Sequence, residues 1–311
     1  MRWVMYQSSS GAECAGLVMD GKIHGLGEGS SVIDLLGDDG EKMDAAAELA
    51  REKPHEVVDL DGARLGPPVR PRQIRDFLTF LDHLRNARKA IGGEIDQAWN
   101  EIPAFYFSNT AAVVGPYDPV EISPGCERFD YELEIAAIIG KEGSDLHPDE
   151  AAEHIAGFTI FNDWSARDLQ MHEMKLTLGP SKGKDGANTF GPMLVTPDEL
   201  EPYRKGNSYH LEMRAYVNDE QVSQGYWDQM DWSWGEIISY ASRGTKVLPG
   251  DAICSGTVPT GCLIEHFAVD PDNFRGWLKP GDIVRLEVDQ LGSTRQEVLP
   301  SRPVHRLRTG F

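Results

Sequence analysis

The chain has 311 residues, enough to bury a sizeable hydrophobic core as one large domain or as two smaller ones. Its 50 acidic and 30 basic residues give a formal net charge of -20, and long-range repulsion therefore opposes binding to nucleic acid or to an anionic membrane. The four cysteines form neither a C-x-x-C pair nor a dense secreted framework, which favours reduced thiols and a cytoplasmic location.

The N-terminal part is predicted to contain short strands in WVMYQ, CAGLVMD and KIHGLG, followed by a helix in MDAAAELARE. The first residues, MRWVMYQSSSG, lack the apolar core of a signal peptide, and no apolar run approaches the length of a membrane span. The segment LGPPVRPRQ contains three prolines without apolar periodicity and is a candidate linker. We therefore expect a small β-rich domain over residues 1–70 and a larger domain over residues 71–311.

Beyond the linker, RDFLTFLDHLRNARKAI has mainly helical spacing, which predicts a helix over residues 75–91. Further helices are predicted in DEAAEHIA, which Pro148 introduces, and in WSWGEIISYASRG. Strand-like runs occur in AAVVG, FDYELEIAAIIG, GFTIFND, GPMLVT, YHLEMRAYVN, DAICSGT and DIVRLEVDQL. Many strands with little regular alternation of strand and helix favour a mixed, mostly β fold of the α+β class, a barrel or sandwich, over a doubly wound sheet.

Two glutamates stand one residue apart in the apolar stretch FDYELEIAAIIG. Glu132 and Glu134 would point to the same side of a strand, because side chains alternate between the two faces, and the opposite face must be buried. Two ionised carboxylates at the mouth of a cavity would repel each other and lose hydration unless a cation or protons compensated. Oxygen ligands suit Mg²⁺, Ca²⁺ or Mn²⁺, whereas the few histidines and unclustered cysteines argue against zinc.

A third acid, Asp163, follows the apolar run IAGFTIF and could bind the same ion. Each motif also has a simpler explanation. A Glu-x-Glu strand is usually a solvated face, and an acid at a strand-to-helix junction can serve only as a helix cap. The residues by themselves leave the metal site and these alternatives open.

Five motifs, taken in order, resemble successive signatures of the fumarylacetoacetate hydrolase superfamily: RDFLTFLDH, FDYELEIAAIIG, NDWSARDLQ, LGPSKGKD and LPGDAICSGT. The resemblance runs from about Arg75 to about Val288. It implies a mixed β-sandwich or roll barrel as the catalytic domain, and a homodimer. It also implies Mg²⁺, with Ca²⁺ or Mn²⁺ as alternatives, held by Asp76, Glu132, Glu134 and Asp163.

The same resemblance implies three catalytic residues. His83 and Glu265 match a histidine and glutamate that activate water, and Lys184 matches a lysine that donates to developing negative charge. A neutral imidazole can take a proton from water near neutral pH, and an adjacent carboxylate orients it and stabilises its charged form. As structural residues, His83 could lie on an ordinary amphipathic helix, while Glu265 and Lys184 could face water.

Substrate-binding positions are implied at Arg167, Gln170, Tyr106 and Thr257, in addition to Lys184. Arg167 could instead form a structural ion pair with Asp163 or Asp168. The sequence also departs from the eponymous hydrolase at three pocket positions.

Leu78 and Met174 replace two tyrosines of the eponymous enzyme, and Gly92 replaces an arginine. These departures remove donors for the distal carboxylate of a diacid. We therefore expect a smaller or more apolar substrate than fumarylacetoacetate.

Together these features predict a metal-dependent hydrolase that cleaves a carbon–carbon bond in an acylpyruvate or another 1,3-diketo or 2-oxo acid. Decarboxylation, isomerisation and hydration of 2-oxo acids are alternatives within the superfamily. A metal-stabilised protein without catalytic activity is disfavoured, because it would have no need of the three catalytic residues. The expected partner is a small oxo acid, with no nucleic acid and no membrane. Residues 75–95 are expected to move as a lid over the substrate.

Overall fold

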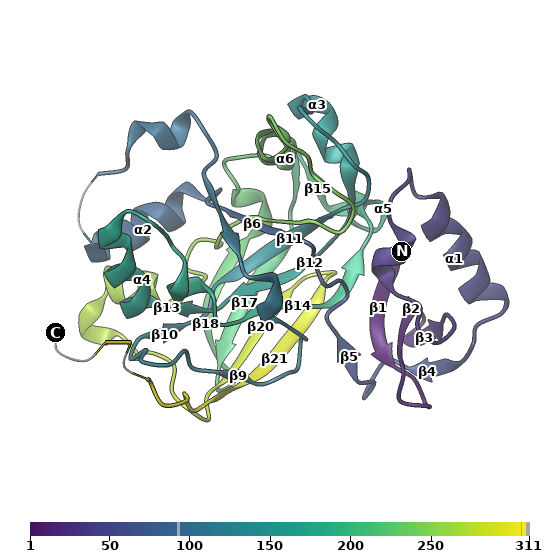
Figure 1. Ribbon diagram of the computed structural model, residues 1–311, viewed down its shortest axis with the longest axis horizontal. Helices are drawn as coiled ribbons and strands as arrows, with labels where there is room; N and C mark the ends of the chain where they lie inside the picture. Colours follow the sequence, from purple (N-terminus) through teal and green to yellow (C-terminus); the bar gives the residue numbers. More distant parts are fainter. Residues whose placement is uncertain (92–93, 306, 309–311) are drawn as a thin grey trace.

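The computed structural model describes residues 1–91, 94–305 and 307–308 (Figure 1). Gly92, one of the three departures from the eponymous hydrolase, lies outside the described residues. The α helices are α1 (Glu41–Glu52), α2 (Leu81–Ile91), α3 (Pro148–Ala151), α4 (Arg167–Glu173), α5 (Pro197–Leu200), α6 (Trp234–Ser242) and α7 (Leu263–Val269).

The larger sheet is 12-stranded, in the order β4-β3-β2-β1-β14-β12-β11-β19-β6-β7, with β5 paired to β1 and β8 paired to β14. Its strands are β1 (Arg2–Gln7), β2 (Glu13–Met19), β3 (Lys22–Gly25), β4 (Val57–Asp59), β5 (Leu65–Gly66), β6 (Ile74–Phe77), β7 (Phe105–Ser108), β8 (Val113–Val114), β11 (Leu133–Ile139), β12 (Ile155–Asp163), β14 (Asn188–Val195) and β19 (Ala252–Cys254).

The second sheet is 5-stranded, in the order β18-β17-β20-β21-β9. Its strands are β9 (Val120–Glu121), β17 (Glu212–Val217), β18 (Glu220–Tyr226), β20 (Ile283–Val288) and β21 (Gly292–Leu299). Two short pairs complete the β structure, β10 (Phe129–Asp130) with β13 (Ser165–Ala166), and β15 (Arg204–Lys205) with β16 (Ser208–Tyr209). The predicted α+β, mostly β class is confirmed as a sandwich or roll, and in the part of the chain that the structure describes neither sheet closes into a barrel.

Strand β11 is buried on both faces and lies at the centre of the molecule. Its odd-numbered side chains, from Leu133 to Ile139, join the core formed with β17 and β20. Ala136 and Ile138 join a second core with residues of β1 and α1. The alternation expected for the Glu-x-Glu segment is therefore confirmed, and Glu134 shares its face with apolar residues in the interior of the protein.

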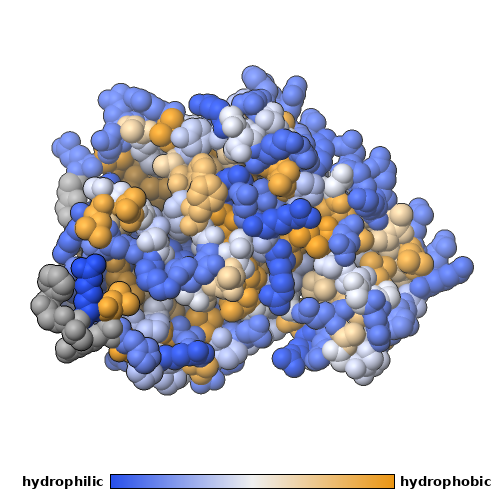
Figure 2. Space-filling view, viewed as in Figure 1, coloured by the Kyte–Doolittle hydropathy of each residue, from blue (hydrophilic) through white to orange (hydrophobic). Residues whose placement is uncertain are grey.

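The N-terminal strand β1 pairs antiparallel with β14, so the N-terminal segment continues the larger sheet (Figure 1). The strands and the helix expected before the linker occur as β1, β2, β3 and α1. The division at residue 70 stays a prediction. On the face shown in Figure 2, hydrophilic residues cover much of the surface, as the charged composition leads one to expect.

The predicted helix over residues 75–91 was wrong in its first part. Ile74–Phe77 is strand β6, which pairs with β19 on one side and β7 on the other, and α2 begins only at Leu81. All four side chains of β6 are buried, and a buried site between two strands overrides a helical spacing of apolar residues. Strands β7, β18 and β21 were missed, as were the short strands β4, β5, β9, β13 and β15. None of the described helices is both long and apolar enough to cross a membrane.

Candidate active site

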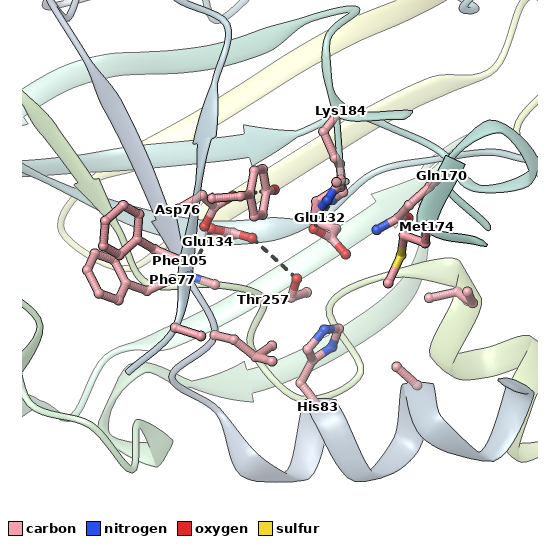
Figure 3. A pocket seen from close by; sticks show the side chains of 18 of the residues that line it. Asp76, Phe77, His83, Phe105, Glu132, Glu134, Gln170, Met174, Lys184 and Thr257 are labelled. Atoms are coloured by element: carbon pink, nitrogen blue, oxygen red, sulfur yellow. Dashed lines mark hydrogen bonds and ion pairs between the residues drawn. The ribbon is translucent and has the colours of Figure 1, made fainter. Parts of the chain in front are cut away.

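Most of the predicted site residues line one cavity of about 370 Å³. Those that line it are Asp76, His83, Tyr106, Glu132, Glu134, Arg167, Gln170, Lys184 and Thr257. The remaining two, Asp163 and Glu265, are buried behind its wall, in contact with Lys184 and His83 respectively. The fold thus brings the predicted residues together from segments far apart in the sequence, and Figure 3 shows several of those that line the cavity.

Three carboxylates converge at the inner end of the cavity. Asp76 lies on β6, Glu134 on β11 and Asp163 at the end of β12, and one oxygen from each lies within 4.8 Å of the others. All three side chains are almost fully buried. Asp163 is not a helix cap, because α4 begins at Arg167 and its N-cap residue is Ala166.

The carboxylate cluster has the properties of a cation site. Burial raises the pKa of Asp76, Glu134 and Asp163. The neighbouring carboxylates raise the pKa of Glu134 further, whereas the charge of Lys184 partly offsets the rise at Asp76 and Asp163. Asp76 Oδ1 and Asp163 Oδ1 are buried and have no hydrogen-bond partner within the described part of the chain. A hard divalent ion would neutralise this cluster and occupy those oxygens, so the residues fit such an ion.

Glu132 stands apart from the other three carboxylates. Arg167 Nη2 donates to its Oε1 at 2.7 Å, and Lys184 Nζ contacts its Oε2. Burial by itself would raise the pKa of Glu132, but the charges of Arg167 and Lys184 outweigh burial and lower it. Lys184 also contacts Asp163, so its ammonium group connects Glu132 with the carboxylate cluster.

His83 and Glu265 form a hydrogen-bonded pair on the other side of the cavity. His83 Nδ1 lies 2.8 Å from Glu265 Oε1, while Glu265 Oε2 accepts from Asn86 Nδ2 at 3.0 Å and from the Thr260 amide at 2.9 Å. Burial opposes the charged form of His83, but the carboxylate of Glu265 outweighs burial and raises the pKa of His83. The imidazole projects from α2 into the cavity (Figure 3).

The other predicted contacts serve mainly to hold the acids. The Tyr106 hydroxyl lies 2.8 Å from Asp76 Oδ2 and also contacts Asp163. Thr257 Oγ1 donates to Glu134 at 3.3 Å. Within the described structure, substrate contacts by these two residues therefore remain a prediction.

Arg167 donates to Gln170 Oε1 at 3.2 Å through Nη1. Its ion pairs among the described residues are formed with Asp130 and Glu132, and the alternative partners Asp163 and Asp168 are not among them. Arg167 is therefore tied into the buried acidic network next to the cavity.

The family model for the fumarylacetoacetate (FAA) hydrolase C-terminal region matches residues 72–299. The chain belongs to the fumarylacetoacetate hydrolase family.

The chain is similar to oxaloacetate tautomerase FAHD2A, mitochondrial, from Homo sapiens, with 31% identity over 73% of this chain and 67% of that protein. Oxaloacetate tautomerase fahd2, mitochondrial, from Xenopus laevis is 28% identical over 96% and 90% of the two chains. Among solved structures, the fumarylacetoacetate hydrolase from Exiguobacterium antarcticum superposes with a TM-score of 0.70 at 26% identity, covering 97% of this chain and 100% of that one.

One wall of the cavity is apolar. Leu78 and Met174 both line the cavity, as expected from the sequence, and they stand among other apolar residues. These neighbours are Phe77, Phe105, Met171 and Ile264. This wall is well suited to contact the hydrocarbon part of a substrate.

Sequence reasoning missed three residues near the His83–Glu265 pair. Asn86 holds Glu265 from α2, and Cys262 Sγ lies 3.4 Å from Glu265 Oε1. Asp130 is buried between Arg167 and the start of α7. A signal for Asp130 was present, because it precedes Glu132 by two residues and therefore falls on the same side of an extended chain.

Proposed function

We propose that this protein is a divalent-metal-dependent enzyme that interconverts the keto and enol forms of a 2-oxo acid of the oxaloacetate type. One observation carries the proposal: a buried carboxylate cluster and the His83–Glu265 pair lie on opposite sides of one cavity, which Asp76, Glu134 and His83 line directly. The names of two relatives support the same reaction, since those from Homo sapiens and Xenopus laevis, at 31% and 28% identity, are named oxaloacetate tautomerases.

The carboxylates Asp76, Glu134 and Asp163 would hold the ion, with Glu132 nearby, and when bound it would supply Lewis-acid polarisation of the oxo acid. His83 takes a proton from the carbon next to the oxo group, through the ring nitrogen that does not face Glu265. The electron pair of that C–H bond forms the C=C bond of an enolate with negative charge on the oxo oxygen, and that oxygen then takes a proton from solvent to give the enol.

Lys184 lines the same cavity and would donate a hydrogen bond to that oxygen. Burial by itself would lower the pKa of its ammonium group, but the charges of Asp163 and Glu132 outweigh burial and raise it, so the group stays charged. Glu265 holds the proton of His83 on Nδ1 and stabilises the imidazolium that forms. The reverse sequence, with the proton returned to carbon, converts the enol into the keto acid.

Hydrolytic cleavage of a carbon–carbon bond in an acylpyruvate is the second candidate. It is favoured by the apolar wall around Leu78 and Met174, which suits a longer and less charged acid than oxaloacetate. In that reaction His83 would take a proton from water instead of from carbon, so the His83–Glu265 pair would act as the general base in both candidate reactions.

Product analysis distinguishes the two reactions. The protein, with Mg²⁺ or with chelator, is incubated with oxaloacetate and with several acylpyruvates, and enol absorbance and product masses are followed. Tautomerisation changes the absorbance at constant mass, hydrolysis gives two acids, and decarboxylation releases CO₂. The proposal fails if Mg²⁺ accelerates none of these reactions, or if His83→Ala is as active as the surface control His147→Ala.

Three further expectations are part of the proposal. We infer a homodimer and Mg²⁺ as the ion. A cytoplasmic location is the third expectation, although the names of several relatives include the word mitochondrial. The lid, expected over residues 75–95, cannot include β6, which is hydrogen-bonded on both sides within the sheet; of the described residues, α2 is the part that could move.

A further inference from the structure

Asp130 connects two parts of the site that are far apart in the sequence, Arg167 and the first turn of α7. Its carboxylate is fully buried. Oδ2 accepts from Arg167 Nε at 2.8 Å and from the Ile264 amide at 3.0 Å. Oδ1 accepts from the Leu263 amide at 2.7 Å and from the Tyr131 amide at 2.8 Å. Each oxygen thus has one bond to the first turn of α7, and the remaining bonds fix Asp130 itself.

Helix α7 depends on this carboxylate for the position of its first turn. The helix has seven residues, and the side chain of its N-cap residue, Cys262, makes no capping hydrogen bond. A carboxylate that accepts from the first free amides of a helix satisfies them and interacts favourably with the positive end of the helix dipole. Glu265 lies in that same first turn.

The other side of Asp130 leads to the carboxylates. Arg167 donates to Asp130 and, through Nη2, to Glu132 Oε1 at 2.7 Å. A continuous series of buried charge-assisted hydrogen bonds therefore runs from Glu132 through Arg167 and Asp130 to the turn that carries Glu265.

We propose that Asp130 is a positioning residue that fixes Glu265, and through it His83, relative to the carboxylate cluster. This inference rests on the proposed function and deepens it. The hydrogen bond of 2.8 Å between His83 and Glu265 tolerates little displacement of α7, and a misplacement of about 1 Å at a reacting group can lower a rate about a hundredfold. The alternative is a purely structural role as a buried ion pair.

The test uses Asp130→Asn, with Asp251→Asn as the matched control. Asp251 is also fully buried, pairs with an arginine and accepts from a backbone amide, but it has no contact with α7. The first readout is the titration of the His83 imidazole, which is monitored by NMR of histidine-labelled protein. The His83 signal is identified as the one that is missing in His83→Asn. The second is kcat and KM for the substrate found in the product screen.

In Asp130→Asn an amide replaces a group that accepts from both helix amides and from Arg167, so the first turn of α7 moves and Glu265 is displaced. The charged groups that face His83 are Glu265 from α7, Glu132 before β11 and Arg167 from α4, and the neutral thiol of Cys262 lies beside Glu265. Because Glu265 provides the main stabilisation of the imidazolium, its displacement lowers the titration midpoint of His83. We expect a lower midpoint and a kcat reduced at least about tenfold with KM changed less than about twofold, and neither change in Asp251→Asn.

The inference is overturned if Asp130→Asn folds and keeps both the His83 midpoint and the kcat of the wild type. If Asp130→Asn does not fold, Asp130→Glu replaces it, since this variant keeps the charge but moves the carboxylate by one methylene. A lowered midpoint and kcat in Asp130→Glu support the inference, and wild-type values for both overturn it. The NMR titration needs no turnover, so a lowered midpoint in an inactive protein would refute the proposed function and leave the positioning role intact.

Discussion

Replacing Glu265 by glutamine tests the role of the His83–Glu265 pair most directly, because the structure predicts which way the new amide faces. Glu265 Oε2 accepts two donors, from Asn86 and from the Thr260 amide, whereas Oε1 faces His83 Nδ1. The amide oxygen of the introduced glutamine would be drawn to the two donors, and its NH₂ group would then face the imidazole. His83 Nδ1 would become an acceptor, so the proton of the neutral ring would move to the nitrogen that should act as base.

The expected loss follows from this change of tautomer. General-base assistance contributes about a hundredfold to ten-thousandfold in rate, and the wrong tautomer of a catalytic histidine in serine proteases lowers kcat about ten-thousandfold. We expect kcat to fall at least about a hundredfold in Glu265→Gln, which corresponds to a barrier higher by ~2.7 kcal/mol. The acidic limb of the pH profile should also move to lower pH, since the carboxylate that raises the pKa of His83 is lost.

The assay is kcat against pH at saturating Mg²⁺ for the wild type and for Glu265→Gln. Glu236→Gln is the control, because Glu236 accepts similar hydrogen bonds in the capping box of α6, away from the cavity. A Glu265→Gln variant with kcat within tenfold of wild type and an unmoved acidic limb would refute the assignment of the pair as the general base.

Three other predictions concern the ion and the substrate. A chelator should abolish turnover, and Mg²⁺ should restore it. Asp163→Asn should weaken Mn²⁺ binding at least about tenfold in calorimetry, because a neutral amide replaces one charge of the cluster. An unchanged affinity would place the ion elsewhere. Mg²⁺ at about one hundred times its Kd should stabilise the wild type by about 2.7 kcal/mol, measured as a higher Tm, and an equal rise in Asp163→Asn would contradict the site. Met174→Tyr adds a hydroxyl donor at the cavity wall and should raise kcat/KM for a dioxo diacid about tenfold relative to a monoacid, whereas an unchanged ratio would show that this wall does not select the substrate.

The alternation of side chains explains why much of the site could be predicted from the sequence. Glu132 and Glu134 were expected on one side of a strand, and both line the cavity. The order of family motifs then supplied Asp76, His83 and Lys184, which no local pattern would have joined to them. Periodicity also predicted α1 and the first three strands of the N-terminal segment correctly, but not β4 or β5.

Long-range pairing explains most of what could not be predicted. The residues around Asp76 have helical spacing, but two neighbouring strands hold them extended. In the same way, nothing in the sequence distinguishes Glu132 from Glu134, whereas in the structure Arg167 and Lys184 form ion pairs with Glu132 and lower its pKa. Packing between distant segments decides which carboxylate pairs with the cationic side chains, and this packing cannot be predicted from a single sequence.

The pairing of β1 with β14 has a consequence for work with fragments of the protein. Arg2 and Trp3 lie opposite Val195 and Leu194, so the first strand covers the C-terminal end of β14. A fragment that starts after the linker would leave that end with free amide and carbonyl groups in a row, a template for association with other chains. The first strand therefore protects the larger sheet from self-association, and a shortened version would need a substitute for it, such as a charged or proline-containing edge.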